Sequence, residues 1–215
     1  MKKFLMLMLV ACLGFFLNPN CKAETYFIAD THFGNENTMK KCRRPYKKVK
    51  DMDEAMMSSW NNIVKDDDDV YILGDVSWHN VTKTIKIITQ LNGNKHLIVG
   101  NHDNKFLKNK EFRECFVEIC DYKEVYLNKD ESIVLCHYPI PCFKNHYYGW
   151  YHLYGHVHTG WEYNMMKHIK QEMTDLYNVP CRMYNVGCMV PYMNYTPLPL
   201  ENIIEGAEKD VKILC

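Results

Sequence analysis

Residues 70–103 read VYILGDVSWHNVTKTIKIITQLNGNKHLIVGNHD and contain the pattern that decides the fold. One apolar run, Val70 to Leu73, ends at Gly-Asp, and a second, His96 to Val99, ends at Gly-Asn-His-Asp. Between them, apolar residues recur at helical spacing from about Thr82 to Leu91. Two strands joined by a helix predict a βαβ unit of a parallel sheet, with polar residues at the carboxyl end of each strand.

The flanking sequence extends this pattern in both directions. Upstream, Tyr26 to Ala29 predicts a strand that stops at Asp30-Thr31-His32, and Asp51 to Val64 has the apolar spacing of an amphipathic helix. Downstream, short apolar runs without intervening helical patterns predict hairpins and a second sheet. Residues 159–180 have the least regular pattern and are expected to form a loop or excursion. The downstream runs cover residues 116–120, 124–127, 132–136, 152–154 and 182–186.

The composition is that of one folded domain. The chain has 215 residues, 47% of them hydrophobic, and only 10 Gly and 8 Pro, which excludes disordered and low-complexity architectures. Lys and Arg total 26, as do Asp and Glu, so the net charge is zero. Without a global positive field, stable binding of duplex nucleic acid is not expected. Because no repeat or linker divides residues 24–215, we expect a single domain there, of unknown oligomeric state.

The first 23 residues have the three parts of a secretory signal peptide. A basic start precedes an uncharged apolar stretch from Phe4 to Leu17, and small residues follow at Cys21 and Ala23. This pattern predicts cleavage after Ala23 and a secreted or otherwise extracytoplasmic domain without a transmembrane segment. A buried helix in a cytoplasmic protein is the alternative, and lipoprotein processing at Cys12 is a weaker one.

Side chains that could bind metal follow five predicted strands. In Asp30-x-His32 and in His156-x-His158, residues two apart on an extended backbone point to one face and can approach a common point. Glycines adjoin three of these strand ends and remove side-chain bulk where the chain turns. One such strand end would be weak evidence, but five together predict a site at the carboxyl edge of the sheet. The candidates are Asp30, His32, Asp75, Asn101, His102, His137, His156 and His158.

The donor types indicate two metal ions rather than one. Two carboxylates, one amide oxygen and four imidazoles, besides His102, are too many ligands for one tetrahedral ion. They fit two ions that share a bridging carboxylate, an arrangement used for phosphoryl chemistry with metals about 3.5 to 4 Å apart. Mixed nitrogen and oxygen donors without thiolate favour manganese, iron, zinc, cobalt or nickel over magnesium or calcium alone.

The order of these motifs resembles the calcineurin-like metallophosphoesterase superfamily, across essentially all of the chain after Ala23. The resemblance implies an α/β (α+β) fold, a four-layer αββα sandwich with two mixed β-sheets. Stretches between the blocks look like a small subfamily of compact bacterial and phage-borne phosphoesterases. The blocks are Asp30-x-His32, Gly74-Asp75, Gly100-Asn101-His102-Asp103, His137 and Gly155-His156-x-His158.

The resemblance also implies a role for each position. His102 would face the scissile phosphate and stabilise or protonate the leaving oxygen, with Asp103 orienting it. A hydroxide that bridges the two metals would attack phosphorus in line. The implied ligands are Asp30, His32 and His158 for the first ion, Asn101, His137 and His156 for the second, and Asp75 as the bridge.

The expected activity is metal-dependent hydrolysis of a phosphodiester or phosphomonoester in a small molecule or nucleotide. Within the basic stretch from Lys40 to Lys50, Arg43 or Arg44 could bind substrate as a phosphate clamp, and a solvated loop is the alternative. Asn35 stands where the subfamily often has a histidine. A non-catalytic scaffold with the same fold and a nuclease are alternative functions, but no implied ligand is missing, which disfavours the scaffold.

Mass spectrometry of the purified protein tests the leader. We expect the mature chain to begin at residue 24, because signal peptidase cleaves after small residues. An intact Met1 would refute cleavage after Ala23.

Overall fold

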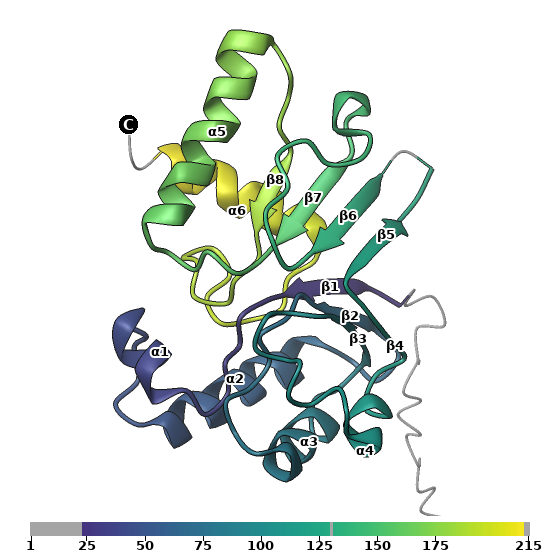
Figure 1. Cartoon of the computed structure of the whole chain (residues 1–215), viewed down its shortest axis with the longest axis vertical. Helices are drawn as coiled ribbons and strands as arrows, with labels where there is room; N and C mark the ends of the chain where they lie inside the picture. Colours follow the sequence, from purple (N-terminus) through teal and green to yellow (C-terminus); the bar gives the residue numbers. More distant parts are fainter. Residues whose placement is uncertain (1–22, 130, 213–215) are drawn as a thin grey trace, which may run out of the picture.

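The computed structural model of the chain describes residues 23–129 and 131–212. Its first sheet has four parallel strands in the order β1-β2-β3-β4 (Figure 1). Because the strands are parallel, their carboxyl ends lie at one edge of the sheet. The strands are β1 (Thr25–Ile28), β2 (Asp69–Ile72), β3 (Asn94–Ile98) and β4 (Glu118–Cys120).

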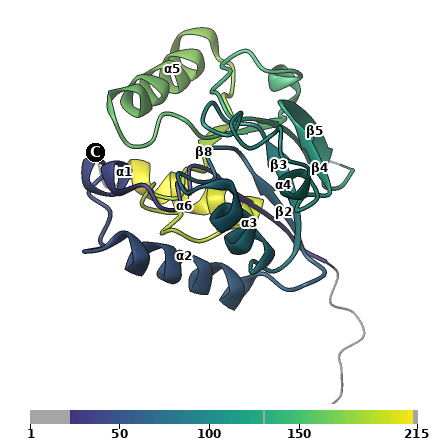
Figure 2. The same cartoon turned by 60° about the horizontal axis from the view of Figure 1, so that its bottom comes forward.

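The helices of the first half pack on one face of this sheet. Met52, Met56 and Trp60 recur every four residues of α2 and are buried there, as an amphipathic helix requires. Figures 1 and 2 place α2 and α3 on the side of the first sheet that faces away from the second. The expected βαβ unit is therefore confirmed. The helices are α1 (Glu36–Lys41), α2 (Val49–Ile63), α3 (Val81–Thr89) and α4 (Lys110–Arg113).

The second half forms the second sheet, in the order β5-β6-β7-β8. Strands β5 and β6 form an antiparallel pair, whereas β6, β7 and β8 run parallel, so this sheet is mixed and the first is not. The strands are β5 (Tyr122–Tyr126), β6 (Ser132–Cys136), β7 (Tyr151–Tyr154) and β8 (Met183–Asn185), and the helices are the 3-10 helix η1 (His146–Tyr148), α5 (Trp161–Tyr177) and α6 (Leu200–Lys212).

Alternate side chains of the first sheet enter two different cores. Phe27 of β1 packs with Leu135 of the second sheet, whereas its neighbours Tyr26 and Ile28 pack with Trp60 of α2. Both faces of the first sheet are thus buried, which explains why its strands are continuous apolar runs. The expected four-layer α/β architecture, with two facing sheets and helices on the outside, is confirmed (Figure 1).

Two sequence predictions about the second half are wrong. The expected loop at residues 159–180 contains α5, a helix of 17 residues. Its buried stripe is narrow, because Tyr163 and Met166 are its only buried residues, while Trp161 and Tyr177 are exposed. Because aromatic residues also occur on the exposed face, the apolar residues of this stretch do not show the spacing of an amphipathic helix. The run at residues 116–120 supplies β4, which pairs with β3 of the first sheet rather than with the second.

The predicted leader, residues 1–23, lies outside the described residues except for Ala23 and stays a prediction. In the described part of the chain, no helix has the length and apolar character needed to cross a membrane. Cys42, Cys115, Cys120, Cys136, Cys142, Cys181 and Cys188 are free thiols.

Candidate metal centre

Four of the five motifs line one cleft of about 290 Å³, and His137 of the fifth lies beside it, with its Nε2 3.0 Å from Asn101 Oδ1. The five motifs follow β1, β2, β3, β6 and β7, so both sheets contribute loops to the site. The main chain links these loops directly, since the backbone N–H groups of Asp30 and His32 donate to the carbonyl oxygens of Gly74 and Asp75. The cleft is lined by predicted residues together with Asn35, Asn37, Thr38, Lys41, Cys42 and Trp78.

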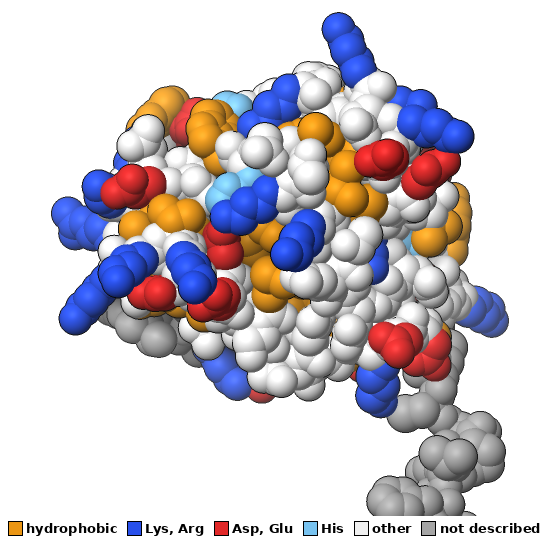
Figure 3. Space-filling view, turned by 90° about the horizontal axis from the view of Figure 1, so that it is seen from below, with side chains coloured by type: hydrophobic (Ala, Val, Ile, Leu, Met, Phe, Trp, Pro, Cys, Tyr) orange, Lys and Arg blue, Asp and Glu red, His pale blue; other side chains and the backbone are white. Residues whose placement is uncertain are grey.

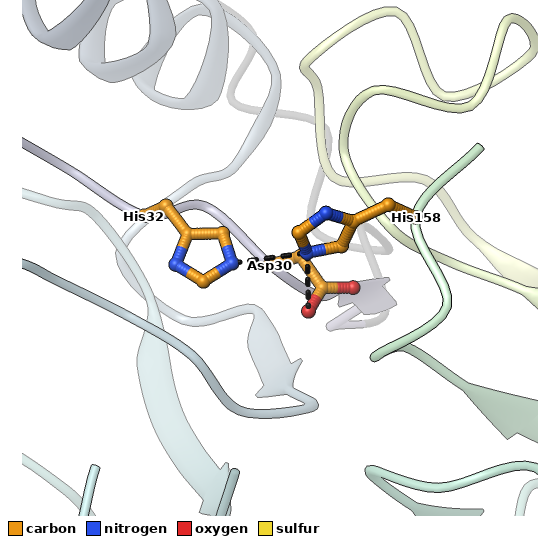
Figure 4. A group of neighbouring side chains, drawn as sticks. All are labelled: Asp30, His32 and His158. Carbon is orange, nitrogen blue, oxygen red and sulfur yellow. Dashed lines mark hydrogen bonds and ion pairs between the residues drawn. The ribbon is translucent and has the colours of Figure 1, made fainter. Parts of the chain in front are cut away.

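Asp30, His32 and His158 form the first ligand group. Their donor atoms lie within 4.8 Å of one another, and Figure 4 shows the three side chains pointing toward a common space. His32 Nε2 is 3.1 Å from His158 Nε2, and His158 Nε2 is 3.7 Å from Asp30 Oδ1. Two imidazole nitrogens and a carboxylate oxygen are suitable ligands for a divalent transition metal.

Asp75 lies between this group and a second one. Its Oδ2 is 3.6 Å from His32 Nε2, and its Oδ1 is 3.7 Å from His137 Nε2. Asp30, Asp75 and His137 also bring their donor atoms within 4.8 Å of one another. The two oxygens of one carboxylate therefore face imidazoles on opposite sides, which is the geometry of a bridging ligand.

The second group gathers around Asn101. Its Oδ1 is 3.0 Å from His137 Nε2 and 3.1 Å from His156 Nδ1. His137 Nδ1 lies 2.7 Å from the carbonyl oxygen of Leu73, which can only accept, so Nδ1 carries the proton. The lone pair of His137 Nε2 consequently points into the site, as metal ligation requires.

Burial favours the neutral form of three of the site imidazoles. It lowers the pKa of both His137 and His158 to about 4, and it lowers the pKa of His32 well below its ordinary value. The same desolvation raises the pKa of Asp30 and Asp75, and for Asp30 the neighbouring Asp75 charge adds to the effect. Among the described residues, these carboxylates form ion-pair contacts with imidazoles but not with Lys or Arg, and a bound metal cation would favour their ionised form. In addition, His32 Nδ1 is buried and has no hydrogen-bond partner within residues 23–129 and 131–212.

Left-handed backbone at the site residues sets their directions. Residues other than glycine rarely adopt a positive φ, because this backbone conformation costs about 1 to 3 kcal/mol for each such residue. Residues that retain this strain cluster at functional sites. The extended Asp-x-His geometry expected from the sequence is replaced here by tight turns. The φ angles are 55° at Asp30, 47° at His32, 56° at Asp75, 69° at His156 and 50° at His158.

His102 stands at the open side of the cleft, with 40% of its side chain exposed. Its backbone N–H donates to Asp75 Oδ1 at 2.9 Å, and its Nε2 is 3.9 Å from Asp75 Oδ2. The ring packs edge to face against Trp78 with 4.5 Å between centroids. Lys105 Nζ lies 4.6 Å from the centroid of the Trp78 ring. His102 is thus accessible to a substrate yet held against the central carboxylate.

Asp103 binds backbone N–H groups, whereas the resemblance implied that it orients His102. Its carboxylate accepts hydrogen bonds from the backbone N–H groups of Asp75, Val76 and Gly100, at 2.8 to 3.0 Å. Asp103 therefore does not orient the His102 ring through a hydrogen bond. It is fully buried and ties the loop after β2 to the loop after β3.

The two arginines do not line the cleft. Arg44 is 4% exposed, and its guanidinium donates to the carbonyl oxygens of Asp30 and Thr31, both at 2.8 Å. It braces the first turn from behind, which corrects the expected role in substrate binding. Arg43 is exposed and does not belong to the cleft lining. The basic residue that does line the cleft is Lys41.

Three supporting residues, Asn185, Cys42 and Asp53, were not found from the sequence. Asn185 Nδ2 donates to the carbonyl oxygen of His158 at 2.9 Å, and Cys42 Sγ lies 3.4 Å from His158 Nδ1. Asp53 Oδ2 is 2.7 Å from His79 Nε2, while its Oδ1 accepts the backbone N–H of Gly34 at 2.9 Å. The sequence contained one indication of these contacts. Asp53 lies on an otherwise apolar face of α2, and a buried carboxylate needs a hydrogen-bond partner.

The site can now be compared with known proteins. The chain matches the calcineurin-like phosphoesterase family over residues 24–178. The chain belongs to this family. It is 33% identical over 188 residues to an uncharacterized protein of Methanocaldococcus jannaschii, covering 86% of this chain and 92% of that protein. It is 32% identical over 92 residues to the gene 66 protein of Mycobacterium phage L5, covering 41% of this chain and 44% of the phage protein.

A solved structure shares the fold of this chain. A protein of unknown function from Aquifex aeolicus superposes with a TM-score of 0.53 and 24% identity, covering 90% of this chain and all of that chain. At this identity the likeness concerns the fold alone.

Replacing Gly74 tests whether the loops are as tightly packed as described. Gly74 has φ 79°, and a Cβ there would lie 2.5 Å from Gly100 Cα and 2.7 Å from His137 Nδ1. We expect Gly74→Ala to lower the free energy of unfolding by roughly 2 kcal/mol or more, from positive φ and steric overlap together. Urea unfolding would measure the change.

Gly160→Ala is the matched control, because its added Cβ would meet only Val157 O, at 4.0 Å. As a change at the N-cap of α5, it should cost less than about 1 kcal/mol. Equal unfolding midpoints for the two variants would contradict the described packing.

Proposed function

We propose that the chain is a binuclear metal-dependent phosphoesterase. The observation that carries this proposal is the position of Asp75, whose two oxygens face His32 on one side and His137 on the other. A carboxylate placed between two groups of imidazoles favours two cations held side by side. The membership of the calcineurin-like phosphoesterase family supports the same conclusion.

The proposed ligands of each ion are the side chains whose donor atoms lie close together. Two bound divalent ions would neutralise charge on the phosphoryl oxygens and activate water for attack on phosphorus. The chain's part is to hold the ions in fixed positions through a preorganised set of strained loops. The first ion would take Asp30, His32 and His158, the second Asn101, His137 and His156, with Asp75 shared. Manganese, iron, zinc, nickel and cobalt all suit this donor set.

His102 would act on the substrate rather than on the metals. Its ring is partly exposed, and its Nε2 is directed toward the same side of Asp75 as the first ligand group. From there the protonated ring could donate to the leaving oxygen as general acid. Trp78 packs against the ring and Asp75 holds the His102 backbone, so the proton would be presented in one direction.

The surroundings of the cleft favour a small phosphate ester or a nucleotide as substrate. The volume of about 290 Å³ matches a small molecule. Trp78 forms one wall, and Lys41 offers a positive charge on the lining. Figure 3 shows Lys and Arg side chains interspersed with Asp and Glu on one face, without a continuous basic surface there.

Hydrolysis of bis-p-nitrophenyl phosphate and p-nitrophenyl phosphate by the Mn²⁺-loaded protein tests the proposal. We expect Asp75→Asn to lower turnover at least about 100-fold, because the amide cannot supply a second anionic oxygen to bridge two ions. Asp67→Asn, at an exposed residue, is the matched control and should leave turnover unchanged. Near-normal turnover by Asp75→Asn would sink the two-metal assignment.

His102→Ala separates catalysis from metal binding. We expect kcat to fall about 10²-fold to 10⁴-fold, the usual contribution of a general acid. The metal content measured by elemental mass spectrometry should not change. His168→Ala removes a histidine outside the cleft and serves as the control. If His102→Ala lost metal together with activity, His102 would be a ligand instead.

A further inference from the structure

A second cavity lies between α5, α6 and the second sheet. Its volume is about 330 Å³, and it shares no lining residue with the metal cleft. The size, and a lining that combines four tyrosines with a few polar side chains, are typical of sites for small organic molecules. The lining includes Tyr154, Tyr163, Met166, Lys170, Tyr184 and Tyr192.

Lys170 places a positive charge in this cavity. Its Nζ donates to the carbonyl oxygen of Met183 at 3.1 Å, which is its one hydrogen bond among the described residues. An ammonium group has three donors, so two remain for another acceptor. Burial lowers the pKa of Lys170, an effect that Cys181 and Glu208 partly offset. An anion beside Lys170 would satisfy these donors and stabilise the charged amine.

Aromatic rings line the cavity beside this charge. Lys170 Nζ lies 4.1 Å from the centroid of the Tyr184 ring, and Lys167 Nζ lies 4.4 Å from that of Tyr163. Two ammonium groups are thus held over tyrosine faces, where cation–π attraction directs them. Flat apolar surface next to fixed positive charge is complementary to a molecule that has an aromatic ring and an anionic group.

We propose that this cavity is a binding site for a small aromatic anion, separate from the metal centre. The ring would pack among Tyr163, Tyr184 and the neighbouring methionines. The anionic group would accept hydrogen bonds from Lys170. An aliphatic anion would not use the aromatic walls, and a neutral aromatic molecule would leave the two donors of Lys170 without an acceptor.

Isothermal titration calorimetry with 2-naphthalenesulfonate tests the proposal, with the neutral 2-naphthalenemethanol as the comparison ligand. Asn185 both lines the cavity and donates to the carbonyl oxygen of His158, so the titration is done on full-length protein in EDTA. The outcome then does not depend on metal binding or hydrolysis. We expect one sulfonate per chain, bound roughly 10-fold to 100-fold more tightly than the alcohol, as a hydrogen bond to a charged group implies.

Lys170→Met retains the length of the side chain and removes its charge. It should weaken binding of the sulfonate about 10-fold to 100-fold and leave binding of the alcohol unchanged. Lys209→Met is the matched control, because Lys209 is exposed on α6, pairs with Glu205 and does not line the cavity. It should bind both ligands like the wild type.

Ala207→Leu provides a second test that leaves every polar group in place. Ala207 lines the cavity from α6, so the larger side chain should block both ligands while a thermal melt shows a folded protein. If Lys170→Met does not fold, Ala207→Leu and the wild-type comparison of the two ligands decide. The proposal is overturned if the wild type does not bind 1 mM sulfonate, if the alcohol binds equally well, or if Ala207→Leu binds unchanged.

Discussion

The strained backbone of the loops after β1, β2 and β7 is the constraint on which the site depends. Asp30, His32, Asp75, His156 and His158 all have left-handed φ, so the site stores several kcal/mol of conformational strain. Buried polar contacts hold these turns in place. Asp103 accepts three backbone N–H groups, and Arg44 donates to two backbone carbonyl oxygens. Asp103 and Arg44 thus hold the main chain in place, and the conformation of the main chain sets the direction of the side chains that face the cleft.

Glycine completes this arrangement by allowing backbones to approach. A Cβ on Gly100 would lie 2.5 Å from the backbone nitrogen of Asp75, and one on Gly155 would lie 2.7 Å from Asp30 Oδ2. The loops can therefore approach one another because side chains are absent directly behind the carboxylates. The same close packing brings histidines from the loops of the second sheet to the aspartates that follow strands of the first. His137, His156 and His158 reach Asp75 and Asp30 only because β6 and β7 stop beside the ends of β1 and β2.

Much of the site could be predicted from the sequence, because parallel strands place their carboxyl ends at one edge. This rule alone was enough to group Asp30, Asp75 and Asn101, and the second-half histidines followed from strand ends of the same kind. The rule did not extend to support residues. Arg44 was expected at the substrate because arginine suits phosphate, yet it is buried behind Asp30. No local pattern tells an arginine that braces a turn from one that binds an anion. Helix α5 was missed because exposed aromatic residues obscure its narrow apolar stripe.

The sequence by itself determined the α/β class, the order of the strands that carry site residues and the identity of the residues brought together. These features depend on local periodicity and on residue type, which are readable along one chain. Only the tertiary structure decided the rest: which sheet receives β4, which basic side chain lines the cleft, and how Asp75 comes to lie between His32 and His137. Such outcomes depend on distances between residues far apart in the chain, and those distances are set by packing of two sheets rather than by any local pattern.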